Sequence, residues 1–302
     1  MDLLLARLIV TLRLEADIAN RYALFSLKSD FESSFRQVAC RSDGLCGGCD
    51  YRRDCPVPAT FDRELSSEPI ALKRHQKPSV PFVFQIPVLP PVAAKGDEVE
   101  LGLVLVGSAT HYVTEYLAAL QRLFFQDPPR ACLPFSLVRI ESTGCSGFRT
   151  LLAMGEGRLN GELLTTISLD DLAAMNTLDS ERIPLRIVTP LRIARDGSLL
   201  RDFSFSPFIR TLLRRVSSLA FYYYGSMLDM DFKRLAVLSD TVSLQEDAFH
   251  WEEWRKGRLC GIVGSGVLCG GLADFHPVLL LGEYLNCGKD AAFGLGSFEL
   301  QR

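Results

Sequence analysis

The sequence lacks several features that would assign a class at once. No stretch approaches the roughly 18 consecutive apolar residues that a membrane helix needs, and the four histidines form no HxxxH or HExxH pair of metal ligands. Low-complexity segments and short-period repeats are absent too. Neither sign of charge is in clear excess, because 36 acidic residues face 33 basic ones and the formal net charge is −3. The chain as a whole is therefore not a polycation, and a nucleic-acid site would have to be a local patch.

Lysine is scarce, since only seven of the 33 basic residues are lysines and the rest are arginines. Arginine offers phosphates a planar fork of donors and stacks on bases, although GC-rich codon usage would produce the same bias. The remaining composition, 48% hydrophobic and 23% charged over 302 residues, excludes a disordered, fibrous or coiled-coil chain. Arg7 and Arg13 interrupt the apolar start of the sequence, and no small-residue cleavage site follows it. This segment therefore predicts a strand rather than a signal peptide. We expect a cytoplasmic protein that does not enter membranes.

The hydrophobic pattern predicts a similar succession of elements in each half. In the first half we expect strands at 3–14 and 97–107, helices at 19–39 and 109–125, and a proline-rich stretch with short strands at 56–96. In the second half we expect strands at 135–142, 184–193 and 293–301, a glycine-bearing hairpin at 258–270, and helices at 274–285 and from Ser206-Pro207 to Gly225. This order predicts an α+β chain of two tandem ferredoxin-like domains. The turn-rich sequence DPPRACLP at 127–134 predicts a boundary between residues 1–130 and residues 131–302.

Four of the nine cysteines cluster within sixteen residues of the first half, as Cys40, Cys46, Cys49 and Cys55. Four thiolates with glycines between them can surround a tetrahedral ion, and the central CGGC forms a tight knuckle. The cluster predicts a structural zinc site without an open catalytic position. An iron–sulfur cluster is an alternative because a proline follows Cys55, and a loop of four cysteines without metal is the other.

Arginine is concentrated in the stretch 182–215, where eight arginines face two aspartates. A local excess of this size fits phosphate binding, although ordinary surface arginines would look the same. Further basic residues follow Trp254. The predicted RNA-binding arginines are Arg186, Arg192, Arg195, Arg210, Arg214, Arg255 and Arg258.

A glycine-rich loop at 288–296 precedes the last predicted strand. Gly288, Gly294 and Gly296 can let the backbone approach a ligand closely and present N–H groups to phosphate oxygens, and Lys289 adds a positive charge. It is not a Walker loop, because no Ser or Thr follows the lysine. A plain turn before a strand would have the same composition. His276 lies one short predicted helix before Lys289, so the two side chains could converge.

Three segments of the second half carry a family resemblance: TPLRIARDGSLLRDFSFSPFIRTLLRRVSSLAFYYYG, WEEWRKGRLCGIVGSGVLCGGLADFHPVLLLGEYL and LGEYLNCGKDAAFGLGSFEL. Together they resemble the RAMP superfamily of CRISPR-associated proteins, and within it the endoribonucleases that cut CRISPR precursor RNA. The similarity covers about 184–302 well. The first half, with its cysteine knuckle, is similar more loosely.

The resemblance implies two ferredoxin-like, RRM-related domains that bind CRISPR repeat RNA, with other CRISPR effector subunits as further partners. It also implies cleavage without a catalytic metal, in which the ribose 2′-OH attacks the adjacent phosphate. Such enzymes commonly use a histidine helped by Tyr or Lys, and we name His276 and Lys289 for these roles. No histidine occurs before residue 75, and Asn286 stands where many relatives have one before the glycine loop. The alternative is therefore a catalytically inactive subunit that binds guide RNA. A third hypothesis, a zinc-knuckle regulator that binds DNA, ranks last because the sequence contains no recognisable helix-turn-helix.

Overall fold

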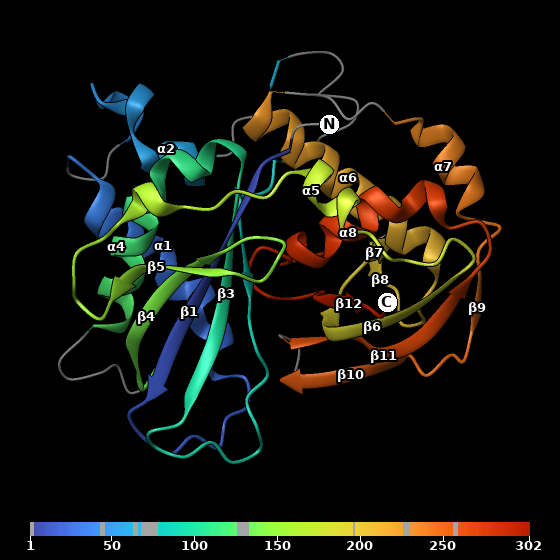
Figure 1. Ribbon diagram of the computed structural model, residues 1–302, viewed down its shortest axis with the longest axis horizontal. Helices are drawn as coiled ribbons and strands as arrows, with labels where there is room; N and C mark the ends of the chain where they lie inside the picture. Colours follow the sequence, from blue (N-terminus) through green and yellow to red (C-terminus); the bar gives the residue numbers. More distant parts are fainter. Residues whose placement is uncertain are drawn as a thin grey trace.

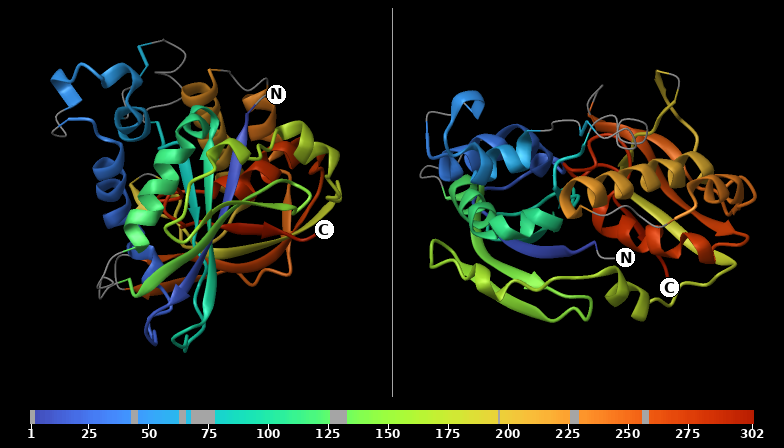
Figure 2. Two further views of the ribbon diagram at one scale, coloured as in Figure 1. Left: turned by 60° about the vertical axis from the view of Figure 1, so that its left-hand side comes forward. Right: turned by 90° about the horizontal axis from the view of Figure 1, so that it is seen from above.

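The computed structural model describes residues 3–42, 46–62, 66–67, 78–125, 133–195, 197–225, 230–255 and 259–302. Two antiparallel sheets lie side by side, one in each half of the chain, and helices pack against both (Figure 1). Figure 2 shows the same two halves from further directions, with the first half in blue to green and the second in yellow to red. The chain is thus a mixed α+β protein, as the pattern predicts.

The first sheet has the order β2-β3-β1-β4-β5. Its strands are β1 (Leu5–Leu14), β2 (Phe82–Gln85), β3 (Glu98–Val106), β4 (Phe135–Thr143) and β5 (Arg149–Met154). Alternate residues of β1, such as Leu8 and Val10, join a core under α1 (Leu27–Ala39) and α4 (Val113–Phe124). The other face of this sheet carries charged residues at its open end and valines where it meets the second half.

The second sheet has the order β10-β11-β6-β12, and β9 also pairs with β11. Its strands are β6 (Arg182–Leu191), β9 (Ser243–Gln245), β10 (His250–Arg255), β11 (Leu259–Cys269) and β12 (Phe298–Leu300). The helices α6 (Phe205–Tyr224) and α8 (His276–Leu285) supply apolar side chains to the same core as this sheet. Smaller elements are α2 (Pro56–Phe61), α5 (Leu169–Ala174), α7 (Phe232–Leu238) and the hairpin of β7 (Ala194–Arg195) and β8 (Ser198–Leu199).

Each half repeats the predicted order of strand, helix, two strands, helix and strand. The four strands β1, β2, β3 and β4 adopt the spatial order β2-β3-β1-β4, and the equivalent strands of the second half adopt β10-β11-β6-β12. The long helix α6 ends at Gly225 as predicted, because that residue adopts the left-handed conformation with φ +72°. Its N-cap is Ser204, two residues before the serine that the sequence indicated.

The predicted boundary between residues 1–130 and 131–302 is wrong. Both β4 and β5 lie after residue 130, yet β4 pairs with β1 and β5 extends the same sheet. The strand predicted at 135–142 is therefore the fourth strand of the first unit rather than the first strand of the second. The turn-rich stretch connects α4 to β4 inside one unit, and turn composition alone does not distinguish such a connection from a linker.

The two halves share an apolar interface and a backbone connection. Val83, Val104 and Val106 of the first sheet join the core of the second half. The N–H of Phe84 on the edge strand β2 donates to the Ala292 carbonyl at 2.9 Å, which adds the glycine-rich loop to the first sheet. Among the described residues, no helix combines the length and apolarity that crossing a membrane requires.

Candidate functional site

A cleft of about 1030 Å³ lies between the two halves. Residues 17–29, which connect β1 to α1 and form its first turn, line one side. Arg192, Trp254, Asp290 and Phe293 from the second half line the other. Because both units contribute, the cleft exists only in the assembled chain, and such junctions are common binding sites.

Three charged side chains meet in this cleft across the whole length of the sequence. Lys28 Nζ on α1 donates to Asp290 Oδ1 at 2.8 Å, and an Arg192 guanidinium N–H donates to Asp290 Oδ2 at 3.2 Å. The Arg192 side chain is 13% exposed, whereas that of Lys28 is 54% exposed. The Nε of Arg192 is buried without a hydrogen-bond partner in the described part of the chain. Two cations therefore share one carboxylate at the edge of a cleft, an arrangement suited to a phosphate group.

Aromatic side chains line the same cleft beside this charged cluster. Tyr22 stacks on Trp254 of β10, with ring centroids 4.6 Å apart and planes 9° apart, and Phe25 meets Trp254 edge to face. Lys28 Nζ lies 5.9 Å from the ring centre of Phe293. Flat aromatic surfaces next to cations can accept both the bases and the phosphates of a single-stranded nucleic acid.

The glycines of the loop 288–296 serve the protein's own backbone. A Cβ on Gly296, whose φ is +66°, would lie 1.8 Å from the Cys287 carbonyl oxygen, and one on Gly288 would lie 2.6 Å from the Arg192 oxygen. The N–H of Gly296 donates to Pro190, and that of Gly294 points to Ala291. The expectation that Gly294 and Gly296 present free N–H groups to phosphate is therefore wrong, since the Gly294 amide bonds within the loop and the Gly296 amide bonds to β6. What the tight loop does is hold Asp290 at φ +62° beside Arg192.

His276 and Lys289 do not meet. His276 is the first residue of α8 and Lys289 lies four residues beyond its last residue, Leu285, so a ten-residue helix, about 15 Å long, separates them. The His276 ring is buried and lies between the Asn176 side-chain amide, 3.0 Å from Nδ1, and the Asp179 carbonyl, 3.3 Å from Nε2. Lys289 is exposed, and its backbone N–H donates to Arg192. The predicted convergence of the two is wrong, because helix length rather than sequence separation sets their distance.

The arginines of 182–215 are dispersed, and acidic partners from distant segments face four of them, Arg182, Arg186, Arg192 and Arg210. Arg186 lies 3.7 Å from Glu299 and its side chain is 60% exposed, whereas Arg192 lies beyond the end of β6. Arg210 bonds to Asp240, and Arg214 Nε on the same helix face donates to the Arg210 carbonyl. Arg195 is exposed in the β7–β8 hairpin. Among the predicted arginines whose side chains the structure describes, only Arg192 lines the cleft.

Arg255 ends β10, and only its backbone is described; Arg258 lies outside the described residues. One arginine that the sequence did not single out for binding has a clear structural role. Arg215 of α6 donates from Nε to the Leu285 carbonyl at 2.8 Å and from another N–H to Ser79 Oγ at 3.0 Å. Burial lowers the pKa of Arg215 to about 10 and raises the pKa of the nearby Cys287 thiol to about 12. Arg215 thus ties the end of α8, and with it the glycine loop, to the first half.

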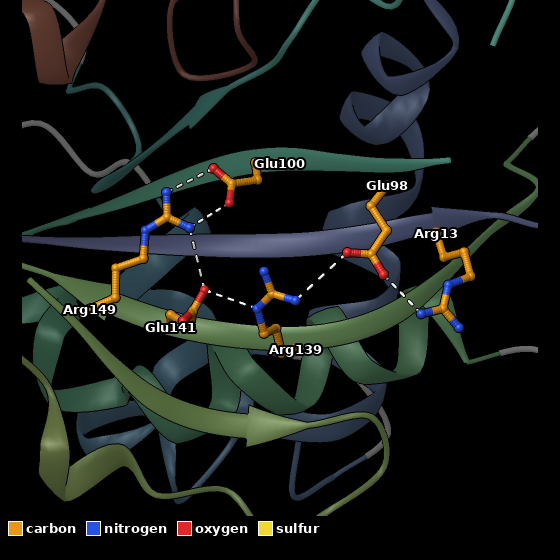
Figure 3. A network of polar contacts seen from close by, with 6 residues as sticks. All are labelled: Arg13, Glu98, Glu100, Arg139, Glu141 and Arg149. Carbon is orange, nitrogen blue, oxygen red and sulfur yellow. Dashed lines mark hydrogen bonds and ion pairs between the residues drawn. The ribbon is translucent and has the colours of Figure 1, made fainter. Parts of the chain in front are cut away.

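The open face of the first sheet carries a row of alternating charges (Figure 3). Arg149 bonds to Glu100 and approaches Glu141 at 3.5 Å. Arg139 lies 3.1 Å from Glu141 and 3.7 Å from Glu98. Glu98 in turn accepts a hydrogen bond from Arg13 at 2.8 Å. The hydrogen bonds from Arg149 hold the pKa of the Glu100 carboxyl below its usual value. Three arginines meet three glutamates on this face, whereas two cations share one carboxylate in the cleft, so the cleft is the better phosphate site.

The four cysteines of the knuckle lie together at the far end of α1 from the cleft. Cys40, Cys46, Cys49 and Cys55 line one cavity of about 10 Å³. Among the described residues, no group of three or more His, Cys, Asp or Glu side chains is arranged to hold a metal ion. The structure brings the four residues to one place, and the metal itself stays a prediction.

Comparison with known proteins gave two family models and a set of solved structures. Residues 3–163 match the AF_1859_N model of an N-terminal domain, and residues 185–298 match the model "CRISPR-associated endoribonuclease Cas6". A search of curated proteins gave no match. The structure resembles Thermus thermophilus Cas6 (TTHB231), with a TM-score of 0.54 and 15% identity over 99% of both chains.

Two further solved structures have the same fold. A Cas6 (TTHA0078) product complex has a TM-score of 0.56 and 15% identity over 99% of this chain and all of that one. A partial Cas6-RT-Cas1–Cas2 complex has a TM-score of 0.56 and 13% identity over 99% of this chain and 46% of that one. The two family models together cover both halves, and the second covers the segments that carry the resemblance in the sequence. Residues 185–298 thus match the family of CRISPR-associated Cas6 endoribonucleases, and the whole chain has the fold of solved Cas6 proteins.

Proposed function

We propose that this chain is an endoribonuclease that binds the repeat RNA of CRISPR precursor transcripts in the cytoplasm and cuts it, on a scaffold of two tandem ferredoxin-like units. The observation that carries the proposal is the cluster of Lys28, Arg192 and Asp290 in the cleft between the halves. Relatives of the same fold were solved as a product complex and as a substrate mimic complex. Both support RNA as the ligand, and the Cas1–Cas2 assembly supports CRISPR proteins as further partners.

The proposed reaction is a transesterification within the RNA. The 2′ oxygen of one ribose attacks the adjacent phosphorus, the bond from phosphorus to the 5′ oxygen breaks, and the products are a 2′,3′-cyclic phosphate and a 5′-OH. The 2′-OH gives its proton to a base, and the leaving 5′ oxygen receives a proton from an acid. The phosphate gains negative charge in the transition state, so Lys28 and Arg192 would stabilise that state more than the ground state. No metal is required by this scheme.

Asp290 is the positioning residue of this cluster. Its carboxylate holds both cations in the absence of RNA, and a bound phosphate would compete with it for the same donors. Tyr22, Lys28 and Asp290 are cleft side chains that can exchange protons, and the acid and the base are to be sought among them. His276 and Lys289, which the sequence indicates, remain proposed alternatives for the acid and base roles. The variants described below distinguish them from Tyr22, Lys28 and Asp290.

One observation favours a second candidate function. None of the described residues that line the cleft is a histidine, the residue that relatives commonly use. A chain with this cleft could bind guide RNA as an inactive subunit of a CRISPR effector complex. Binding and cutting must therefore be measured separately.

The test is single-turnover cleavage of the repeat RNA from the neighbouring CRISPR array, in the presence of EDTA. We expect cutting at one position, a 2′,3′-cyclic phosphate on the upstream fragment, and no cutting of RNA with a single 2′-deoxy nucleotide at that position. Lys28→Ala and Arg192→Ala should each slow cleavage by about ten- to a thousandfold, as loss of one charge stabiliser does. Lys289→Ala should weaken binding only modestly, because Lys289 does not line the cleft.

The matched control is Lys233→Ala, which removes an exposed lysine of α7. It should cut at the wild-type rate. Tight binding of the repeat without cutting, with or without divalent metal, would establish the second candidate instead. Absence of both binding and cutting would remove CRISPR repeat RNA as the substrate.

A further inference from the structure

The cysteine knuckle is a sequence feature that the proposed RNA cleft does not use. Cys40 follows the last residue of α1, Cys46 begins a three-residue 3-10 turn, Cys49 follows that turn, and Cys55 precedes α2. All four line the same cavity of about 10 Å³. Side chains separated by up to fifteen positions thus converge at one end of α1.

The described backbone between Cys46 and Cys55 has little regular structure. Its only regular elements are two 3-10 turns of three residues each, at Cys46–Gly48 and Arg52–Asp54, and neither contains a buried residue. The thiol of Cys40 donates to the Ser42 carbonyl at 2.9 Å, and Ser42 Oγ lies 3.4 Å from the Cys49 sulfur. Weak sulfur hydrogen bonds of this kind cannot replace a hydrophobic core, and small segments without a core commonly rely on a metal or disulfides.

Positive charge surrounds the cavity. A guanidinium N–H of Arg36 lies 4.0 Å from the Cys46 sulfur, and Arg52 donates to the Cys46 carbonyl at 3.1 Å. Arg41 and Arg52 line the cavity itself. A divalent ion with four thiolates carries a net charge of −2, so arginines at this spacing would offset the charge that metal binding creates.

We propose that Cys40, Cys46, Cys49 and Cys55 bind one divalent, thiolate-preferring cation, and that this ion is zinc. Each cysteine loses its proton on binding, and the four sulfurs complete a tetrahedral shell without an open position. An iron–sulfur cluster on the same four thiolates is the alternative that the iron measurement below tests. The thiols move inward by a small amount when the ion binds, since no group among the described residues has metal-binding geometry beforehand.

The site would act on structure rather than on cleavage. It lies at the carboxyl end of α1, a helix of thirteen residues and thus about 20 Å long, whereas Lys28 lies near the other end. The ion would fasten the knuckle and α2 to α1, and its loss would lower the thermal stability of the first half. The inference is therefore independent of the proposed endoribonuclease activity.

The experiment uses the full chain without an affinity tag, purified in the presence of zinc. Elemental analysis should find about one zinc per chain. After removal of the zinc, addition of Co²⁺ should restore occupancy and give the thiolate-to-cobalt absorption of a tetrahedral sulfur site. Cys46→Ser and Cys49→Ser should lose the zinc and melt at a lower temperature. The matched controls Cys145→Ser and Cys269→Ser, which change half-buried cysteines elsewhere, should keep it.

The cobalt spectrum is measured on the wild-type chain, so the proposal is tested even where a variant fails to fold. Absence of zinc together with absence of the cobalt–thiolate absorption would overturn the site. Iron with the absorption of a cluster would overturn the single ion. Equal zinc content in Cys46→Ser and in the wild type would assign the metal to other residues and overturn the ligand set.

Discussion

Replacing Asp290 by asparagine separates the two effects of the cleft carboxylate, on stability and on RNA binding. Asp290 has φ +62°, a left-handed conformation that asparagine adopts more readily than most residues. The two side chains have nearly the same shape, so the change removes a charge and little else. In the wild type, Asp290 faces Lys28 and Arg192, and the net charge of the three side chains is +1. It rises to +2 when the carboxylate becomes an amide.

The expected effects have opposite signs. The bond from Arg192, whose side chain is 13% exposed, should be worth about 1.5–3 kcal/mol as a hydrogen bond between charged groups. The Lys28 side chain is 54% exposed, so its ion pair contributes about 0–1 kcal/mol. An asparagine oxygen keeps part of the first bond, and we expect a loss of about 1–3 kcal/mol in the free energy of unfolding. RNA affinity should rise, because the phosphate no longer competes with the carboxylate.

Urea unfolding and RNA binding over a range of salt concentrations measure the two effects on the same protein. The plot of log K against log salt should steepen by up to about 0.7 for one additional single-strand phosphate contact. The matched control is Asp240→Asn, which removes the partner of Arg210 on the surface away from the cleft and should change neither the affinity nor the slope. Unchanged affinity and an unchanged salt slope in Asp290→Asn would refute the assignment of this cluster to phosphate binding.

Three further outcomes follow from other parts of the molecule. His276→Ala should lower the free energy of unfolding by about 1–3 kcal/mol, because the Asn176 and Asp179 groups lose a buried partner. The rate of single-turnover cleavage by the folded fraction should be unchanged. A hundredfold loss of that rate would restore His276 as a catalytic residue. The pKa of Glu100 is lowered in the folded state, so its ion pair stabilises the protein above about pH 4.5 and is lost as the pH falls through the folded-state pKa. Glu100→Gln should therefore flatten the acid limb of the stability profile, by less than about 1 kcal/mol for so exposed a pair, and acid unfolding curves that overlay those of the wild type would contradict this. Gly296→Ala should severely reduce the yield or stability of the folded chain, since its Cβ would lie 1.8 Å from the Cys287 oxygen; a normal melting temperature would show that the loop can adjust.

Several strands and helices were predictable because one face of each is buried, whereas β5 and α5 were not predicted. The hairpin expected at 258–270 is wrong, since Leu259–Cys269 form the single strand β11. The predicted strand at 97–107 is β3, and the predicted helix at 274–285 corresponds to α8. The assignment of strands to sheets was less predictable. The strand at 135–142 is apolar in any arrangement, and only its pairing with β1 shows that it completes the first unit. Pairing partners are set by packing over the whole unit, which a local pattern does not contain.

The candidate site was only partly predictable, because its members are far apart in the chain. Lys28 and Asp290 are separated by 262 positions, and no motif surrounds Lys28. Asp290 lies inside the glycine-rich segment that carries the family resemblance, but the motif indicated the glycines and Lys289, not this carboxylate, as the functional residues. The signal that could have helped is the resemblance itself, since it implied two ferredoxin-like units and included the segment that contains Asp290.

The net charge of a stretch of sequence was a poor predictor of the RNA-binding arginines for a related reason. Residues 182–215 carry six more positive than negative charges, yet Glu246, Glu299, Asp240 and Asp290 come from later segments and face four of those arginines. A charge acts through space, so its partners need not be near it in the chain, and a surface that is basic in sequence can be neutral in the fold. Arg192 differs from the other three because it is largely buried, lines the cleft, and has an Nε without a hydrogen-bond partner in the described part of the chain. Burial and position in the cleft, rather than local charge, therefore distinguish the arginine that we expect to contact RNA.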